Sequence, residues 1–485
     1  MIRKLSDISK LLMIPLIACS FFLIVPPNAG TDELWSARVA WFLYENPKTL
    51  FSKSEISTYE FPGSLTIPNE QIGEGIPYPC FFENNLVPSS CQILQDDKNV
   101  GVGQFDRVFR SAPFYFFVGW AMHVSPIYNS YWSGKLAALF LNCVLLFLSM
   151  LIMKQSGLHT DKIVQSFTIS ALPILTFSLG TISPIAFEVS CAYLFMSMLY
   201  YCLKKVQDFR YLHYSSVLLS LSALLLSLSR PLGGIWGLMI LLFMSIMLSR
   251  HKLIIINASI FLLLGLLIQT RIDNYTFRFG NGNRYSITPN LEFYIEESIR
   301  VVLNSGNWIK QIFGLWTYAG APELPTVFML ISFVSFIFIF YWEILFSARK
   351  TAVITLMIIG FFGVPILFSL LFAHQWPMWW SGRYEMPLLL PLVFLITTRL
   401  TQNRRTILYF TSVFVSVVYL VVVFARFNWG LYPNGTPVMI NKPSFSPTLS
   451  ITWALLTTIW LLFSMAWSTR LLTWVYRLPL QTGSR

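Results

Sequence analysis

Apolar runs of about 18 to 22 residues recur along nearly the whole chain, separated by short polar segments. A helix needs about 20 mostly apolar residues to cross the hydrocarbon core of a bilayer. Only 12% of the residues are charged, roughly half the share found in soluble domains. We therefore expect an all-α polytopic membrane protein, a single integral membrane domain over residues 1–485, rather than a large soluble core.

The apolar runs predict about 12 transmembrane helices. Their expected positions are residues 9–26, 131–153, 163–182, 185–203, 212–229, 232–249, 253–270, 325–346, 351–373, 386–399, 406–425 and 448–468. The first run has a basic start like that of a signal peptide. No clean small-x-small cleavage site follows it, so we expect a retained helix.

The positive charges predict the orientation of the chain. The net charge of +12 is spread over small groups of Lys and Arg at the ends of the apolar runs, which is the pattern of the positive-inside rule. If both termini are cytoplasmic, the inner side receives Lys154, Lys162, Lys204, Lys205, Arg210, Arg250, Lys252, Arg349, Lys350, Arg399, Arg404, Arg405, Arg470, Arg477 and Arg485. Anionic lipid headgroups explain these groups without a nucleic acid. We expect a multi-pass protein of the cell membrane.

A short apolar stretch at 112–125 is not counted as a span. Counting it would invert every later loop and place the basic groups outside. We expect this stretch to lie on the outer face of the membrane or to dip into it. The same topology places two long loops outside, at residues 27–130 and 271–324.

The first outer loop begins with a predicted amphipathic helix in which Leu34, Trp41 and Tyr44 recur at helical spacing, as does Ala37. Six prolines follow, so little regular structure is expected there. Cys80 and Cys91 are the only cysteines in a polar loop. An oxidising exterior favours a disulfide between them. In the second outer loop, residues 291–313 have helical spacing.

Asp32 and Glu33 open the first outer loop. Acids at this position suit the start of a helix, because they face the positive end of its dipole. A carboxylate at the membrane's edge also suits a general base that accepts the proton of a hydroxyl. Asp32 is the preferred base, with Glu33 as a positioning group or the reverse. A divalent ion bridging Asp32 to a phosphate is left open, although no ligand spacing supports it.

Two ionisable residues, Lys135 and Glu188, fall inside predicted spans near their outer ends. A charge there costs on the order of 2.5–3.5 kcal/mol on insertion scales, so it needs a partner or a cavity. In one interpretation Glu188 pairs with Lys135 or Arg230 and joins two helices. In the other, Lys135 and Glu188 line a substrate cavity, because they lie on the same side as the acids.

Further candidates for contacts with the substrate lie at the outer edge. The guanidinium forks of Arg230 and Arg383 suit a phosphate. Alternatively, Arg383 is an interfacial anchor paired with Glu385, and Arg230 extends toward the aqueous surface. His374 is a weaker candidate, because a single His there is more often interfacial than catalytic.

Several short motifs resemble, in the same order, those of the domain-of-unknown-function 2142 family of multi-pass membrane proteins. They are Asp32-Glu33, Val87-Pro88-Ser89-Ser90-Cys91, Ala112-Pro113-Phe114-Tyr115, Ser183-Pro184 with Glu188, Ser229-Arg230-Pro231-Leu232 and Gly382-Arg383-Tyr384-Glu385-Met386-Pro387-Leu388. The chain departs from that family where it lacks an Asp within 314–318 and where Lys135 replaces the more usual Arg. The family in turn looks like a branch of the GT-C glycosyltransferases.

The resemblance implies a GT-C-like fold and transfer of a sugar from a polyprenyl-phosphate donor to a cell-envelope glycan acceptor outside the cytoplasm. Fold-level similarity carries limited functional weight. A transporter or flippase of lipid-linked saccharides is the alternative, and it predicts charges near mid-membrane and broken helices in paired halves. A non-catalytic membrane protein is a third, and it predicts no phenotype for Asp32→Asn and Glu33→Gln.

Overall fold

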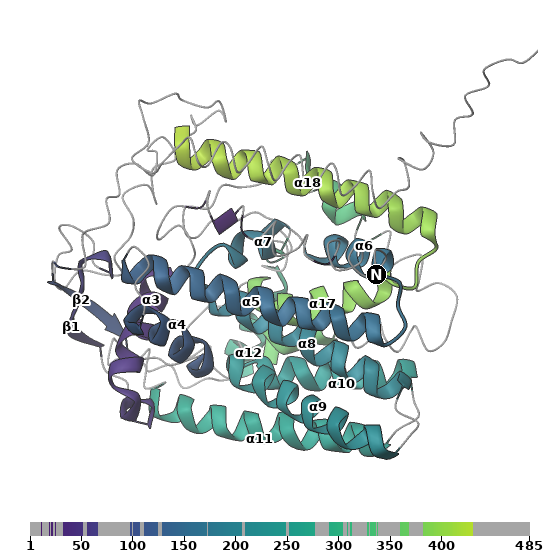
Figure 1. Cartoon of the computed structure of the whole chain (residues 1–485), viewed down its shortest axis with the longest axis horizontal. Helices are drawn as coiled ribbons and strands as arrows, with labels where there is room; N and C mark the ends of the chain where they lie inside the picture. Colours follow the sequence, from purple (N-terminus) through teal and green to yellow (C-terminus); the bar gives the residue numbers. More distant parts are fainter. Residues whose placement is uncertain are drawn as a thin grey trace, which may run out of the picture.

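The computed structural model describes most of the helical part of the chain. The described residues are 11, 19, 21–22, 25, 33–51, 56–65, 98, 100–106, 111–124, 129–171, 173–205, 209–248, 252–276, 291–303, 308, 311–312, 327–328, 330–335, 337, 359–367 and 382–429. They form a bundle of helices with a small two-stranded sheet at one end (Figure 1).

Within the described residues, four helices are long and apolar enough to cross a membrane. They are α5 (Ser130–Gln155), α8 (Pro184–Lys205), α11 (Lys252–Thr276) and α18 (Gln402–Trp429). At about 1.5 Å per residue each is at least as long as the ~30 Å hydrocarbon core. The predicted helical membrane character is therefore confirmed, whereas the predicted number of spans stays a prediction.

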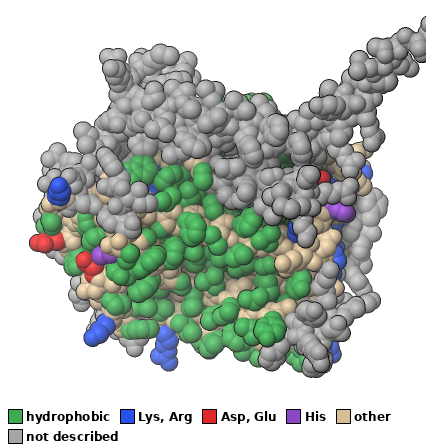
Figure 2. Space-filling model, in the orientation of Figure 1, with side chains coloured by type: hydrophobic (Ala, Val, Ile, Leu, Met, Phe, Trp, Pro, Cys, Tyr) green, Lys and Arg blue, Asp and Glu red, His purple; other side chains and the backbone are tan. Residues whose placement is uncertain are grey.

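α8 is the central helix of the bundle, and it packs against α5, α9 (Phe209–Ser229), α10 (Gly233–Leu248) and α17 (Met386–Thr397). The outer helices instead leave apolar side chains exposed, such as Phe140, Leu267 and Ile407. Figure 2 shows hydrophobic side chains as a broad area over the middle of one face, with Lys and Arg at its margins. In water this surface would be unfavourable, so it is the surface that lipid covers.

Two expected spans differ in the structure. The segment at 163–182 is broken into α6 (Thr160–Ser170) and α7 (Pro173–Leu179). Pro173 explains the break, because proline lacks the N–H and its ring clashes with the preceding turn. α17 matches the expected span at 386–399 but has 12 residues, or about 18 Å of helix, which is shorter than the hydrocarbon core. The expected spans at 9–26, 325–346, 351–373 and 448–468 lie wholly or largely outside the described residues.

The first outer loop is more regular than predicted. α3 (Glu33–Glu45) is followed by η1 (Pro47–Phe51), β1 (Ile56–Pro62) and η2 (Gly63–Leu65). β1 pairs antiparallel with β2 (Val100–Asp106), so that Ile56 lies opposite Asp106 and Pro62 opposite Val100. The expectation of little regular structure was wrong here, because β-branched and aromatic residues between the prolines favour strands. Cys80 and Cys91 lie outside the described residues.

The helix predicted at the start of this loop is confirmed as α3, but it is not simply amphipathic. Leu34 and Ala37 are buried as expected, and so are the polar Ser36 and Arg38. The Arg38 side chain donates from Nε to the carbonyl oxygen of Leu65 at 2.7 Å. α3 is thus covered by η2 on one side and by α4 (Ala112–Val124) on another. The stretch at 112–125, which was not counted as a span, forms this short packed helix.

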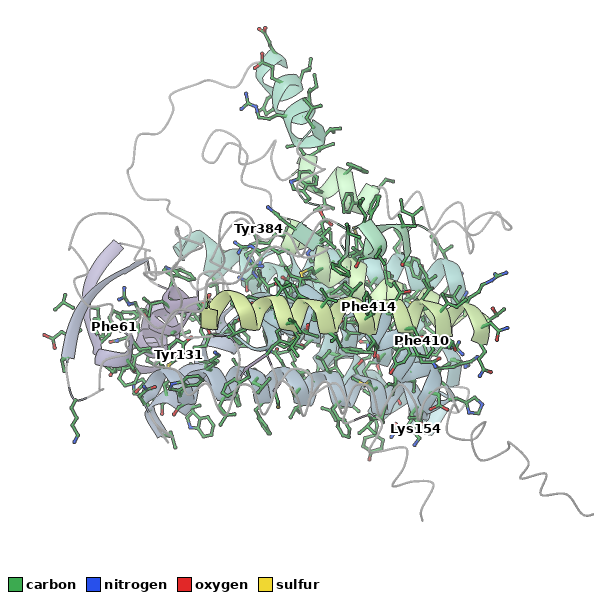
Figure 3. All side chains as sticks on the ribbon, turned by 90° about the horizontal axis from the view of Figure 1, so that it is seen from above. Phe61, Tyr131, Lys154, Tyr384, Phe410 and Phe414 are labelled. Carbon is green, nitrogen blue, oxygen red and sulfur yellow. The ribbon has the colours of Figure 1, made fainter. Side chains whose placement is uncertain are left out.

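The two ends of the bundle differ in charge. We call the end with α3, α4, β1 and β2 the hairpin end, and the other the basic end. Figure 3 shows Phe61 and Tyr131 at the hairpin end and Lys154 at the basic end. Lys204, Lys252 and Arg404 also stand at helix ends, in the last turn of α8 and the first turns of α11 and α18. The predicted topology assigns the basic end to the cytoplasm, and this orientation stays a prediction.

Gly119 allows the close contact between α3 and α4. A Cβ at this position would clash with the carbonyl oxygen of Ala40 and would lie 2.9 Å from the Cβ of Tyr44. We expect Gly119→Ala to destabilise the protein by about 1–3 kcal/mol, since overpacking outweighs the gain in helix propensity of roughly 1 kcal/mol. Thermal unfolding in detergent measures the effect. Gly363→Ala is the control, because its added Cβ would lie at an ordinary contact distance of 3.4 Å from the Ile359 side chain. An equal loss of stability in both variants would contradict the role of Gly119 in the contact between α3 and α4.

Candidate functional site

Glu33 is the first residue of α3 and is almost completely buried, with 1% of its surface exposed. Its Oε1 accepts a hydrogen bond from the backbone N–H of Ile182 at 2.9 Å. Ile182 lies just before α8, where the Ser183 hydroxyl oxygen accepts a hydrogen bond from the Ala186 N–H at 3.4 Å and Pro184 is the first helical residue. This is a regular N-cap with proline at N1. Glu33 therefore fixes the start of α3 to the start of α8.

Lys135 belongs to the same group of charges. It is fully buried on α5, and its Nζ donates to the carbonyl oxygen of Val25 at 2.6 Å. The ammonium also lies 4.9 Å from the ring centre of Trp132 and 5.3 Å from that of Phe22, distances that suit cation–π attraction. Glu33 interacts electrostatically with it. Lys135 thus joins α5 to residues that precede the first outer loop.

Glu188 and Arg230 form a second, separate charged group. Arg230 Nη1 lies 3.5 Å from Glu188 Oε2, and their side chains are 11% and 1% exposed. Of the two pairings expected for Glu188, the one with Arg230 is confirmed, and Arg230 points into the bundle rather than toward water. Glu188 Oε1 and Arg230 Nε have no hydrogen-bond partner among the described residues. A buried ion pair with unused polar atoms is expensive unless something else completes it.

Arg383, Tyr384 and Glu385 bring a third chain segment to this pair. The Arg230 guanidinium carbon lies 4.9 Å from the centre of the Tyr384 ring, and that of Arg383 lies 5.2 Å from the same centre. Tyr384 and Glu385 are buried, whereas Arg383 is half-buried. Figure 3 shows Tyr384 in the half of the bundle nearer Tyr131, and so toward the hairpin end. Two guanidinium groups therefore converge on one aromatic ring.

The two charged groups contact nearby positions around the start of α8. Ile182, which contacts Glu33, and Glu188, which contacts Arg230, are separated by six residues around the N-terminus of this helix. The helical part of that separation, from Pro184 to Glu188, rises only about 6 Å. Two N–H groups at this helix end, those of Ile182 and Ala186, already bond Glu33 and the Ser183 hydroxyl. The guanidinium groups of Arg230 and Arg383 are the part of this arrangement that is suited to a phosphate.

The structure thus brings together most of the described candidates from the sequence. Glu33 and Lys135 form one group, and Glu188, Arg230 and Arg383 form the other, with Glu385 next to Tyr384. Asp32, His374 and the Cys80–Cys91 pair lie outside the described residues. No set of three His, Cys, Asp or Glu side chains within the described part of the chain is suited to hold a metal ion.

Sequence reasoning missed a polar contact that holds α3, α4 and β1 together. Tyr59 donates its hydroxyl to Glu45 Oε2 at 2.6 Å, and His123 Nε2 lies 3.4 Å from Glu45 Oε1. The His123 ring stacks on Trp41 with the ring centres 3.7 Å apart. Partial burial, together with the hydrogen bond to Glu45, raises the pKa of the Tyr59 phenol. The sequence signal for this contact was the acid Glu45 at the end of α3 together with His123 in the last turn of α4.

Buried hydroxyl groups deeper in the bundle have a simpler explanation. Ser149 and Ser197 lie within hydrogen-bond distance of each other at 2.6 Å, and so do Ser170 and the Tyr193 hydroxyl. These contacts join α5 to α8 and α6 to α8. Serine and tyrosine hydroxyls commonly bond across helices in membranes and stabilise their packing. They need no transported substrate, so they do not favour the transporter interpretation.

We expect the Glu188–Arg230 pair to be required for stability. Glu188→Leu leaves a buried guanidinium without its carboxylate, and the expected loss is about 3–5 kcal/mol. Glu188→Leu with Arg230→Leu is expected to lose much less than the sum of the two single variants. Unfolding in detergent measures each value. Ser149→Ala is the control, because it removes one partner of a neutral buried pair, and its expected loss is about 1 kcal/mol. Additive losses from Glu188→Leu and Arg230→Leu would show that the charged pair is not coupled.

Two charged groups thus contact the start of α8, one at Ile182 just before the helix and the other at Glu188 in its second turn. Comparisons with protein-family models, with curated proteins and with solved structures found no match for this chain. The function is therefore argued from the chain's own residues.

Proposed function

We propose that this protein is an extracytoplasmic glycosyltransferase of the GT-C type that uses a polyprenyl-phosphate-linked sugar donor to build cell-envelope glycan. The observation that carries the proposal is the convergence of Arg230 and Arg383 on Tyr384 beside the half-satisfied carboxylate of Glu188. This group of residues combines positive charge with an aromatic surface in a chain whose outer surface is apolar. A donor with a phosphate and a lipid tail needs both the positive charge and the apolar surface.

Each part of this group matches one part of the donor. The guanidinium groups of Arg230 and Arg383 bind phosphate oxygens and offset the charge that develops as the sugar leaves. The unsatisfied Nε of Arg230 is a donor already held in the protein interior. The buried ring of Tyr384 positions these two guanidinium groups next to each other. The apolar surface of the bundle is suited to the prenyl chain.

Asp32 is the proposed general base. It directly precedes Glu33, whose carboxylate is occupied by the Ile182 N–H and interacts with Lys135. A buried and bonded acid is suited to holding the chain in place, which leaves the neighbouring acid for the proton transfer. In the proposed step the acceptor hydroxyl gives its proton to Asp32 while its oxygen bonds to the anomeric carbon. The bond from that carbon to the phosphate oxygen breaks, and polyprenyl phosphate leaves with the electron pair.

The proposal is tested with purified protein in proteoliposomes, a panel of radiolabelled polyprenyl-phosphate sugars and envelope acceptors. Asp32→Asn is expected to lower the transfer rate by about 100-fold or more, the usual contribution of a general base. Lys154→Gln, at the basic end, is the control and is expected to keep full activity. No transfer from any donor by the wild type, or full transfer by Asp32→Asn, would refute the proposed chemistry.

The role of Arg383 is tested separately by a conservative change. Arg383→Lys keeps the positive charge but removes the planar fork that holds two phosphate oxygens. We expect the KM for the donor to rise, with a smaller effect on the KM for the acceptor. Steady-state kinetics over both substrates give the two values. An equal rise in both, or none, would assign Arg383 to anchoring alone.

The outer location of the site depends on the topology. Single cysteines in residues 206–208, in a predicted cytoplasmic loop, and in residues 280–286, in the second predicted outer loop, can be labelled with a membrane-impermeant reagent on intact cells. We expect labelling only at 280–286. Labelling of residues 206–208 from outside would invert the topology and place the charged groups in the cytoplasm.

A further inference from the structure

Glu45, His123 and Tyr59 meet at the hairpin end, where α3, α4 and β1 come together (Figure 1). Glu45 is the last residue of α3, and its two carboxylate oxygens face different elements. Oε2 accepts a hydrogen bond from the hydroxyl of Tyr59 on β1 at 2.6 Å, and Oε1 lies 3.4 Å from Nε2 of His123 on α4. These three residues lie outside the two charged groups of the candidate site.

The other ring nitrogen of His123 determines where the protons of this ring lie. Nδ1 is 2.8 Å from the carbonyl oxygen of Gly119. A carbonyl oxygen only accepts, so Nδ1 carries a hydrogen whether the ring is neutral or charged. In the neutral ring Nε2 is therefore a bare acceptor, and it faces an acceptor oxygen of Glu45. A proton on Nε2 turns this contact into an attraction between an imidazolium and a carboxylate.

The rings around His123 also favour its charged form. The imidazole stacks on Trp41 with the ring centres 3.7 Å apart and the planes 24° apart. The ring centre of Tyr44 lies 4.7 Å from that of the imidazole. A cation this close to the face of an aromatic ring is attracted by the ring's quadrupole. The His123 side chain is 18% exposed, so water screens these contacts less than it would on an open surface.

The other titratable groups near this ring leave Glu45 as its ionic partner. Burial and the hydrogen bond to Glu45 raise the pKa of the Tyr59 phenol, so Tyr59 stays protonated and continues to donate. Glu60, the next residue of β1, acts on Tyr59. α5, α8 and α9 also pack against α4, and among the described residues none of their charged side chains forms an ion pair with His123.

We propose that His123 and Glu45 form a proton-dependent ion pair that joins the end of α4 to the end of α3 and, through Tyr59, to β1. Histidine is the side chain that changes its charge between pH 5 and 8. In acid the ring donates to both Gly119 and Glu45. As the pH rises the ring loses the Nε2 proton, and two acceptors then face each other. The stabilisation is therefore present at low pH and is lost at high pH, independently of any transfer chemistry.

A double-mutant cycle on the full chain in detergent tests the ion pair at about pH 5.5 and about pH 8.5. Glu45→Gln keeps an acceptor for Tyr59 but removes the charge, and His123→Asn keeps a donor near the position of Nδ1. We expect the two changes to be coupled about three- to tenfold in the unfolding equilibrium at the lower pH, and uncoupled at the higher pH. His159→Asn, at an exposed histidine before α6, is the control and is expected to show no coupling with Glu45→Gln.

Nitrogen NMR of ¹⁵N-histidine-labelled wild type gives a second measurement that needs no change at Glu45. We expect the His123 ring to carry hydrogens on both nitrogens at the lower pH and on Nδ1 alone at the higher pH. Its signal is the one that His123→Asn removes. Because the chain has five histidines, it is also the one that single asparagine substitutions at the other four leave in place. The assignment therefore stands even if His123→Asn does not fold.

Three outcomes would overturn the proposal. Equal coupling at both pH values would show that the contact between His123 and Glu45 does not depend on the proton. No coupling at the lower pH would show that the two side chains do not stabilise the hairpin end together. A hydrogen on Nε2 at the higher pH would show that the neutral ring already donates to Glu45, so that a rise in pH does not weaken the contact.

Discussion

The structure depends on the cost of keeping charged side chains inside an apolar bundle. An isolated charge in such surroundings is strongly unfavourable, so each one must be paired or bonded. Among the described residues, Glu33, Lys135 and Glu188 each join elements that are distant in the chain. Glu33 connects the first outer loop to the start of α8. Lys135 connects α5 to Val25, and Glu188 connects α8 to Arg230. The apolar helices thus supply most of the buried surface, and these few charges determine how their ends at the hairpin end meet.

The parts of the fold that could be predicted from the sequence are those set by local pattern. Apolar runs gave the positions of α5, α8, α11 and α18 because the length needed to cross a bilayer is fixed. The sequence predicts one span at 163–182, and Pro173 explains why the structure has two helices there, α6 and α7. The hairpin was missed because prolines masked a strand pattern, and its pairing joins residues 56–62 with residues 100–106. That pairing is a tertiary property that no local window contains.

The candidate site shows the same limit. The sequence predicts that Glu188 has a partner, because an acid within a predicted span needs one. Arg230 and Lys135 are the two expected partners. The choice between Arg230 and Lys135 depended on how α8, α9 and α5 pack, which residue spacing does not give. Arg38 carried the same signal, a charge within a helix of otherwise mostly apolar residues, and it proved to bond Leu65. The contact of Tyr384 with Arg230 joins segments more than 150 residues apart and has no local signature.

The positions of the charges also bear on how a substrate would arrive. Arg230 is 9% exposed and Glu188 is 1% exposed, so neither side chain is open to water in the way that a site for a soluble sugar nucleotide would require. Half-buried Arg383 is the most exposed member of this group. Any phosphate must lose hydration to reach these cations, but a lipid-linked one keeps its apolar tail in the bilayer while it does so. The burial of these cations is the feature that the proposed lipid-linked donor would have to match.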